Sequence, residues 1–177
     1  MIVESYRDFE PPAEFKRSVE MLLRYVPQEY LVGLKSIVLT NRAALNRNQR
    51  RQKIWSRNRK VRLAECRGSY SREWKSSPAT VWLYVDNILQ SEPEALRRIP
   101  ILRYYSTGEV LYHEIGHHIH SVHEPVYEGR ENVAEDWSRR LWRHFLRTRY
   151  WYLTPFLYLL RFALKPLAKW FKKQNNL

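Results

Sequence analysis

His113-Glu114-Ile115-Gly116-His117 has the pattern H-E-x-x-H, and it lies within a longer stretch, Glu109–Val122, whose apolar residues recur at helical spacing. Residues four apart stack on one face of a helix, so both histidines can direct a ring nitrogen at the same ion. Glu114 lies about a quarter-turn away and can reach a water molecule on that ion without ligating it. The pattern therefore predicts a catalytic zinc site with His113 and His117 as two of its ligands.

The rest of this helix supports a packed position for the motif. Five of the six histidines fall between positions 113 and 123, so one alternative is a helix that simply carries solvated histidines. On a helical wheel, however, apolar side chains gather on the side opposite the motif: Leu111, Tyr112, Ile115, Ile119 and Val122. Such a helix packs on a core and presents the motif to a cleft.

A hydrolytic zinc site takes a third protein ligand, and two residues compete for this position. His123 completes the spacing H-E-x-x-H-x-x-x-x-x-H, which resembles the metzincins. Those proteins carry glycine where this chain has His120, a position at which the helix must turn sharply. They also need a downstream methionine turn, whereas the only methionines here are Met1 and Met21. We therefore expect the third ligand to lie elsewhere.

Glu131 is the preferred third ligand. It lies in a second helical stretch, Arg130–Arg149, which follows a break at Glu124-Pro125. The apolar stripe of this second helix consists of Val133, Ala134, Trp137, Leu141, Phe145 and Leu146. Packing of the stripe would bring Glu131 to the ion, while Glu135 would accept a hydrogen bond from a ligating histidine. Alternatively, both are solvated acids at a helix start, favoured by the macrodipole. The fallback ligands are Glu128, Glu135 and Asp136.

Two motifs carry a resemblance to a known family: Tyr112-His113-Glu114-Ile115-Gly116-His117-His118, and Glu131-x-x-Ala134-Glu135-x-x-Ser138. They resemble the gluzincin clan of zinc metallopeptidases, and most closely its small members, the minigluzincins and the ImmA/IrrE-like peptidases. Upstream, Gly68-Ser69-Tyr70 and Thr80–Ile88, which ends in Asp86-Asn87-Ile88, resemble the strand pair before the active helix. The resemblance covers residues 15 to 148. It implies a zinc-dependent hydrolase in which His113, His117 and Glu131 bind Zn²⁺ and Glu114 is the general base.

The order of the predicted elements indicates an α+β fold. We expect an N-terminal helix, a three-stranded sheet, and then the two motif-bearing helices. The predicted segments are a helix over Pro12–Tyr25, strands within Tyr30–Thr40, Val61–Tyr70 and Val81–Ile88, a long exposed loop or a poorly ordered hairpin over Asn41–Arg59, and a helical turn or two over Glu92–Arg103. The strand Val81–Ile88 is expected at the edge of the sheet, where it can pair with a peptide substrate. Residues 1–149 would form the zincin-like domain and 150–177 an appended segment.

Composition narrows the class of protein. A single cysteine, Cys66, excludes an internal disulfide and is typical of a reducing compartment. It is expected to be a small core residue. The N-terminus has early acids and lacks the apolar run of a secretory signal, so a cytoplasmic location is expected, with peripheral attachment to a membrane as an extension. Candidates for stabilising an oxyanion are Tyr127, His123 and His144. The substrate, the cleavage preference and the oligomeric state are left open.

The net charge of +13 is unevenly distributed. No acid occurs between Leu31 and Ala64, whereas cations accumulate there: Arg42, Arg47, Arg50, Arg51, Lys53, Arg57, Arg59, Lys60 and Arg62. This run, with Trp55 inside it, predicts a surface for polyanions, unless it is only a solvated basic face. It supports an alternative function, an inactive zincin-fold module that binds nucleic acid or an anionic membrane.

The C-terminal segment 150–177 is strongly apolar and aromatic, with lysines toward its end. Arg161 and Lys165 interrupt its apolar residues, so it is too short and too charged to span a bilayer. Three placements stay open. The segment can lie on an anionic membrane surface, it can pack on the domain or on another subunit, or it can occupy the cleft as a terminus does in minigluzincins.

Overall fold

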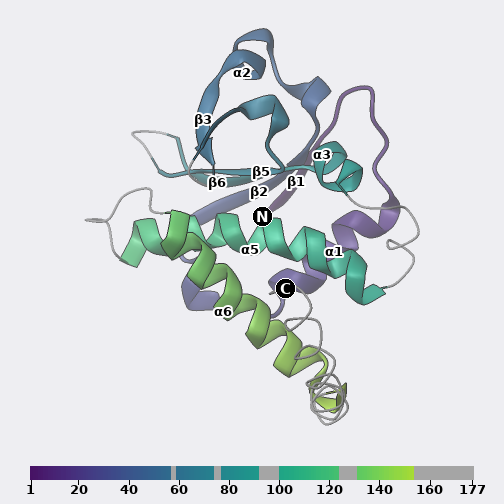
Figure 1. Ribbon diagram of the computed structural model, residues 1–177, viewed down its shortest axis with the longest axis vertical. Coiled ribbons are helices and arrows are strands. Elements are labelled where there is room, and N and C mark those ends of the chain that lie inside the picture. Colours follow the sequence, from purple (N-terminus) through teal and green to yellow (C-terminus); the bar gives the residue numbers. More distant parts are fainter. Residues whose placement is uncertain (57–58, 74–76, 92–99, 124–130, 154–177) are drawn as a thin grey trace, which may run out of the picture. The chain divides into compact units, whose positions relative to one another are not determined.

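The computed structural model describes residues 1–56, 59–73, 77–91, 100–123 and 131–153. Their fold is a mixed α/β architecture, built on one four-stranded sheet and a separate two-stranded hairpin (Figure 1). The elements in chain order are β1 (Ile2–Ser5), α1 (Ala13–Leu23), η1 (Gln28–Leu31), β2 (Leu34–Thr40), η2 (Arg42–Ala44), α2 (Arg47–Arg51), β3 (Lys53–Ser56), β4 (Arg59–Arg62), η3 (Leu63–Glu65), β5 (Gly68–Ser71), β6 (Ala79–Tyr84), α3 (Val85–Gln90), α5 (Pro100–His123), α6 (Glu131–Arg149) and η5 (Trp151–Leu153), where η denotes a 3-10 helix.

The central sheet has the strand order β1-β2-β6-β5. β1, β2 and β6 run parallel, and β5 is antiparallel to β6. The two inner strands, β2 and β6, supply fully buried side chains to the core: Ile37, Leu39, Val81 and Leu83. A run of apolar β-branched and aliphatic residues is typical of a strand covered on both faces, so the strand predicted within Tyr30–Thr40 is confirmed.

The edges of the sheet differ from the prediction. The sheet has four strands rather than three, because the N-terminal residues form β1 beside β2. β6 is an inner strand and is not at the edge, so the placement of Val81–Ile88 at the cleft edge was wrong. In the described part of the chain, the strand next to β6 at this end of the sheet is β5. A four-residue edge strand with Val3 half-exposed gives too little apolar pattern to predict from sequence.

β6 also ends earlier than predicted. The chain turns into helix α3 at Val85, so Val81–Ile88 is a strand followed by a helical turn. Val85 and Ile88 are both fully buried and stand three residues apart, which is the spacing of one helical face. Similarly, Val61–Tyr70 is not one strand but β4, the short helix η3 and then β5.

Helices α1 and α5 pack together beside the sheet. The amphipathic pattern of α1 is confirmed, because Phe15, Val19 and Leu22 are all buried. The hydroxyl of Tyr112 on α5 donates a 3.0 Å hydrogen bond to the carbonyl of Leu22 at the end of α1. This buried hydrogen bond fixes the position along α1 at which α5 packs against it.

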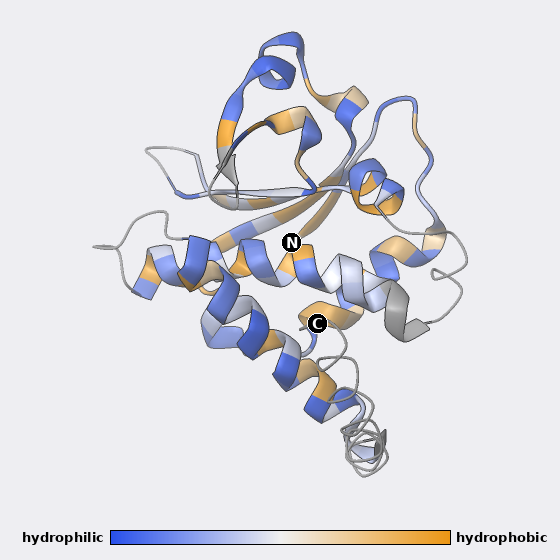
Figure 2. Ribbon diagram, in the orientation of Figure 1, coloured by the Kyte–Doolittle hydropathy of each residue, from blue (hydrophilic) through white to orange (hydrophobic). Residues whose placement is uncertain are grey.

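The segment Arg42–Arg62 is more ordered than predicted, and we call it the basic lobe. It contains α2 and the antiparallel hairpin β3–β4, on the side of the sheet away from α5 (Figure 1). A small apolar cluster of Leu45, Leu63, Cys66 and Tyr84 lies beneath it, with Ile54 and Val61 of the hairpin packed against the cluster. Much of the lobe's ribbon is hydrophilic, whereas the inner strands are hydrophobic (Figure 2). Cys66 is buried, as expected.

The described chain divides into two compact units, Met1–Trp142 and Arg143–Leu177, and α6 runs from the first into the second. In the second unit, Phe145 is buried and its ring meets Tyr150, while Trp151 is 71% exposed. Within the described residues, no helix has the length and apolar character needed to cross a membrane. The predicted placements of the C-terminal segment concern residues 154–177, which lie outside the described residues.

Candidate metal centre

Helix α5 positions both histidines of the motif, and it confirms the predicted helix over Glu109–Val122. The face opposite the motif is buried at Leu111, Tyr112, Ile115 and Ile119. Val122 differs from the prediction because it lies in the last turn of α5 and is 47% exposed. His113 and Glu114 are themselves 9% and 7% exposed, so the motif faces the protein interior rather than bulk water.

A glycine inside the motif sets the distance between α5 and α6. A Cβ atom at Gly116 would lie 2.5 Å from the carbonyl oxygen of Ala134 and 3.0 Å from its Cα. Only glycine permits this backbone approach, and the small side chain of Ala134 completes it. Glu131 lies one turn before Ala134 on α6, so the same contact brings Glu131 to the motif.

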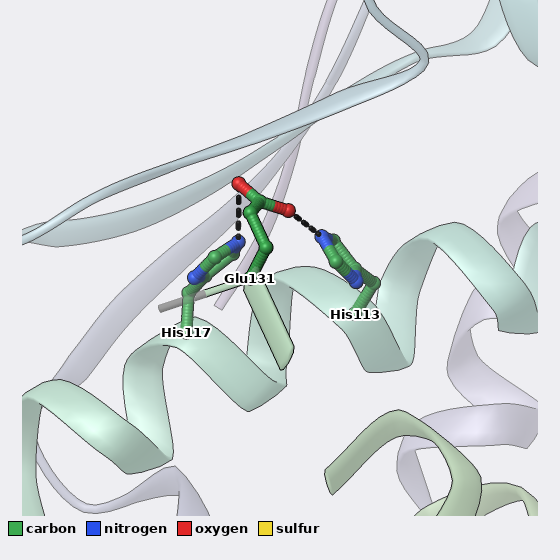
Figure 3. Close-up of side chains that lie close together, drawn as sticks. All are labelled: His113, His117 and Glu131. Carbon is green, nitrogen blue, oxygen red and sulfur yellow. Dashed lines mark ion pairs between the residues drawn. The ribbon is translucent and has the colours of Figure 1, made fainter. Parts of the chain in front are cut away.

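His113, His117 and Glu131 converge, as Figure 3 shows. The Nε2 atom of His113 is 3.2 Å from Oε2 of Glu131, and Nε2 of His117 is 3.8 Å from Oε1 of the same carboxylate. The imidazole rings are 4.8 Å apart and nearly perpendicular, at 86°. One ligand atom from each residue lies within 4.8 Å of the other two, which is close enough to hold a metal ion. The sequence-predicted trio is therefore brought together.

The spacing of the three ligand atoms fits a small divalent cation. Nitrogen and oxygen ligands at about 2.1 Å in a tetrahedron are about 3.4 Å from one another. The two nitrogen–oxygen separations, 3.2 Å from His113 to Oε2 and 3.8 Å from His117 to Oε1, lie on either side of this value, and one ligand atom from each residue lies within 4.8 Å of the other two. Two imidazoles and one carboxylate also leave one tetrahedral position for a water or a substrate. The residues present are thus close enough to one another to hold a metal ion.

Burial keeps the His117 imidazole neutral. Desolvation lowers the pKa of His117 to about 4, with a further contribution from His113, and the nearby Glu131 carboxylate opposes the shift. A neutral imidazole has a lone pair on one ring nitrogen, and this is the form that binds metals. The electrostatics of the site therefore agree with its geometry.

Glu114 lies against the edge strand β5. A Cβ atom at Gly68, the first residue of β5, would come within 2.9 Å of Oε1 and Cγ of Glu114. The glycine therefore provides the space that the Glu114 side chain occupies between α5 and the sheet. A carboxylate held in this way next to the histidines is suited to accepting a proton.

A cavity of about 320 Å³ opens beside His113 and Glu131, between α5 and α6. These two residues line one side of it, and the rings of Tyr105 and Trp142, which meet edge-on at 5.6 Å, line its aromatic side. Further polar side chains come from Glu109 and from the exposed face of α6. The cavity is large enough for an amino-acid side chain.

None of the other described candidates belongs to the trio, although Glu135 lines the same cavity as His113 and Glu131. His123 is exposed at the end of α5, where its ring meets Tyr30. Glu135 and Asp136 are more than half exposed and pair with Arg139 at 2.9 and 3.2 Å. The hydrogen bond proposed between Glu135 and a ligating histidine stays a prediction. Glu128 and Tyr127 lie outside the described residues, and His144 belongs to the second unit.

Sequence reasoning missed a polar chain that joins β5 to α5. Nε2 of His118 donates to the carbonyl of Val32 at 3.0 Å, and Nδ1 lies 3.2 Å from the hydroxyl of Tyr70 on β5. The same hydroxyl is 2.8 Å from Ser121. Because His118 is 1% exposed, these bonds satisfy a buried imidazole and hold the edge strand at the helix. A histidine next to His117 gave no sequence signal that separated this role from ligation.

Comparison of the chain with protein-family models, with curated proteins and with solved structures finds no match. The chemistry of the site therefore has to be argued from its own residues.

Proposed function

We propose that this protein is a zinc-dependent peptidase of the gluzincin type. The observation that carries the proposal is the convergence of His113 and His117 from one helix with Glu131 from the next, with ligand atoms within 4.8 Å of one another. Two imidazoles and one carboxylate are a frequent ligand set for hydrolytic zinc. When bound, the ion would supply Lewis acidity for an amide carbonyl and lower the pKa of a water molecule.

The remaining chemistry belongs to side chains around the trio. Glu114 would take a proton from the attacking water and deliver it to the leaving amine. The Glu114 side chain lies against Gly68, the first residue of the edge strand β5. The 320 Å³ cavity beside His113 would receive one side chain of the substrate. The polypeptide backbone of the substrate would pair with β5 rather than with β6, because β6 is an inner strand.

Metal analysis tests the ligand assignment. We would measure the zinc content and affinity of the purified chain and of the variants Glu131→Ala and His123→Ala. Loss of Glu131 should weaken zinc binding by more than the roughly 100-fold that loss of a supporting contact causes. His123→Ala is the matched control, because His123 is an exposed residue of the same helix. Zinc lost from the His123 variant and retained by the Glu131 variant would refute the assignment.

Hydrolysis is tested separately with Glu114→Gln. This variant keeps the size of the side chain and should bind zinc normally, yet cleavage of casein and of a fluorogenic peptide mixture should fall by roughly 10²- to 10⁴-fold, the usual contribution of a general base. Equal turnover by wild type and variant would exclude the proposed role of Glu114. Zinc binding with no cleavage by the wild type would leave the metal centre but remove the peptidase.

A further inference from the structure

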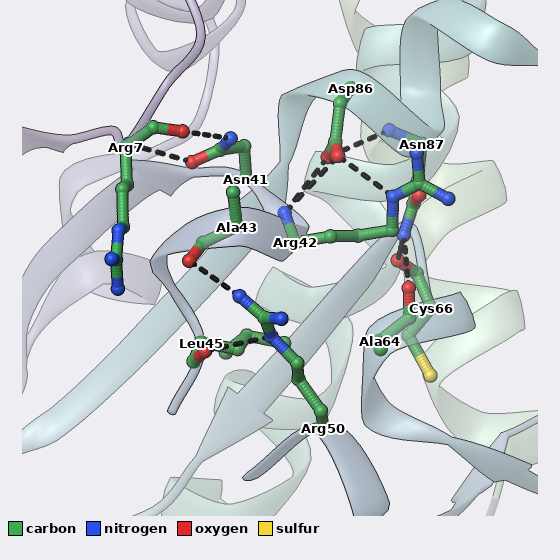
Figure 4. Close-up of polar contacts among 10 residues, drawn as sticks. All are labelled: Arg7, Asn41, Arg42, Ala43, Leu45, Arg50, Ala64, Cys66, Asp86 and Asn87. Atoms are coloured by element: carbon green, nitrogen blue, oxygen red, sulfur yellow. Dashed lines mark hydrogen bonds and ion pairs between the residues drawn. The ribbon is translucent and has the colours of Figure 1, made fainter. Parts of the chain in front are cut away.

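Hydrogen bonds to Asp86 and Asn87 hold the two ends of the basic lobe, as Figure 4 shows. The carboxylate of Asp86 accepts hydrogen bonds from the backbone and side chain of Arg42 at 3.1 and 3.0 Å, where the lobe begins. Asn87 donates to the carbonyls of Ala64 and Cys66 at 3.0 and 2.6 Å, just beyond the point where the lobe ends. Two adjacent residues after β6 thus hold both ends of the segment.

The hairpin of the lobe has an inner and an outer face. Ile54 and Val61 are cross-strand partners and pack against the small apolar cluster beneath the lobe. Because side chains alternate along a strand, their neighbours Lys53 and Arg62 belong to the outer face, and both are exposed. These two cations are themselves directly opposed partners in the register. Trp55 and Lys60 are paired two positions further along the same register.

Like charges are placed side by side at two points of the lobe. Lys53 and Arg62 are opposed across the hairpin, an arrangement that destabilises a strand pair. Arg47 and Arg51 are exposed and stand four residues apart on α2, where like charges also repel. No acid occurs from Leu31 to Ala64, so neither pair has a compensating acid within its own stretch of sequence. An external polyanion would relieve both repulsions.

We propose that the outer face of the basic lobe binds the phosphate backbone of a nucleic acid. Charge complementarity favours phosphates, and a two-stranded ribbon with cations along one face can follow a sugar–phosphate chain. A membrane surface is a poorer partner, since membrane-bound elements add an apolar face to their cations. In this lobe the apolar residues Ile54 and Val61 face the protein core instead. The proposal does not depend on the metal centre.

Salt-dependent binding of the full-length protein tests it. The probe is a fluorescein-labelled thymidine oligonucleotide of about 15 nucleotides, followed by anisotropy. With four contributing cations, affinity should fall roughly 50-fold between about 50 and 200 mM salt, from a slope of about −0.7 per phosphate. The variant Lys53→Gln/Arg62→Gln should bind more weakly at low salt, and its affinity should fall only about 7-fold over the same range.

The matched control is Arg24→Gln/Lys35→Gln, which removes the same charge from two exposed positions outside the basic lobe, one just after α1 and one in β2. It should retain the wild-type slope. The Lys53→Gln/Arg62→Gln variant should also keep or raise its melting temperature, because it removes the repulsion between the two cations. This measurement distinguishes a loss of phosphate contacts from unfolding. The proposal is overturned if the wild type does not bind, or if both double variants lose binding equally. Displacement of the oligonucleotide by phosphatidylserine vesicles at equal charge concentration would also overturn it, in favour of a membrane surface.

Discussion

Replacing Gly116 by alanine is the most direct test of how the two helices build the metal centre. The new Cβ atom would lie 2.5 Å from the backbone oxygen of Ala134, which is 0.9 Å short of ordinary contact at 3.4 Å. Backbone cannot rotate out of the way, so α6 must retreat by about that amount. Glu131 is carried by the same turn of α6, and its 3.2 Å separation from His113 should grow to about 4 Å.

Two opposing effects determine how much Gly116→Ala changes the free energy of unfolding. Overpacking costs about 1–3 kcal/mol, whereas exchange of a helical glycine for alanine recovers up to about 1 kcal/mol. We therefore expect a net loss of about 1–2 kcal/mol in urea unfolding of the metal-free protein. Zinc affinity should fall by roughly 10- to 100-fold, as when a ligand loses the contact that orients it.

Gly108→Ala is the control for this variant. There the Cβ atom would meet the Trp142 ring at 2.6 Å, and a side chain can turn aside where a backbone cannot. Its effect on zinc affinity should be much smaller. If Gly116→Ala binds zinc as tightly as the wild type and unfolds at the same urea concentration, the close helix contact does not position Glu131.

Three further variants or measurements address other contacts. Gly68→Ala would place a Cβ atom 2.6 Å from Cγ1 of Val110 and 2.9 Å from Oε1 of Glu114 and should displace the Glu114 carboxylate; zinc content should persist by elemental analysis while peptide hydrolysis falls at least about tenfold. Asp86→Ala leaves the Arg42 amide without its acceptor and should lower the free energy of unfolding by about 2 kcal/mol in urea titration. Burial raises the pKa of the Cys66 thiol to about 11, so the native protein should react with a thiol reagent at pH 8 far more slowly than the urea-unfolded chain. Wild-type zinc content with full hydrolysis in the first case, unchanged unfolding in the second, or rapid native labelling in the third would contradict these expectations.

The long helices and the metal trio could be predicted from sequence because their signals are local and periodic. The apolar stripes of α1, α5 and α6 extend over three turns or more, so tertiary context adds little to the assignment. The motif fixes His113 and His117 by spacing alone. The prediction of Glu131 also required the assumption that the two helices pack side by side. The close backbone contact at Gly116 agrees with this assumption.

The sheet edges and the basic lobe could not be predicted because their stability comes from distant partners. Asp86, which holds the start of the lobe at Arg42, follows it by 44 residues, and Asn87 holds the carbonyls just beyond the end of the lobe. Its own sequence is polar and cationic, which is the composition expected of a loop. β6 ends at Tyr84 because Val85 and Ile88 turn to the core at helical spacing, and a short apolar run does not distinguish strand from helix.

The choice of third ligand follows from the position of a glycine. A histidine six residues after His117 can reach the same ion only if the helix ends and the chain turns back between them. Here α5 continues to His123, which lies about 9 Å further along the axis and some 240° around it. In this chain a glycine lies inside the motif, at Gly116. There it allows α6 to approach α5 closely and does not end α5. In the proposed zinc site, a chain that keeps its first helix intact and opens one side to α6 would take its remaining ligand from α6, and Glu131 is the acid one turn before the point of contact.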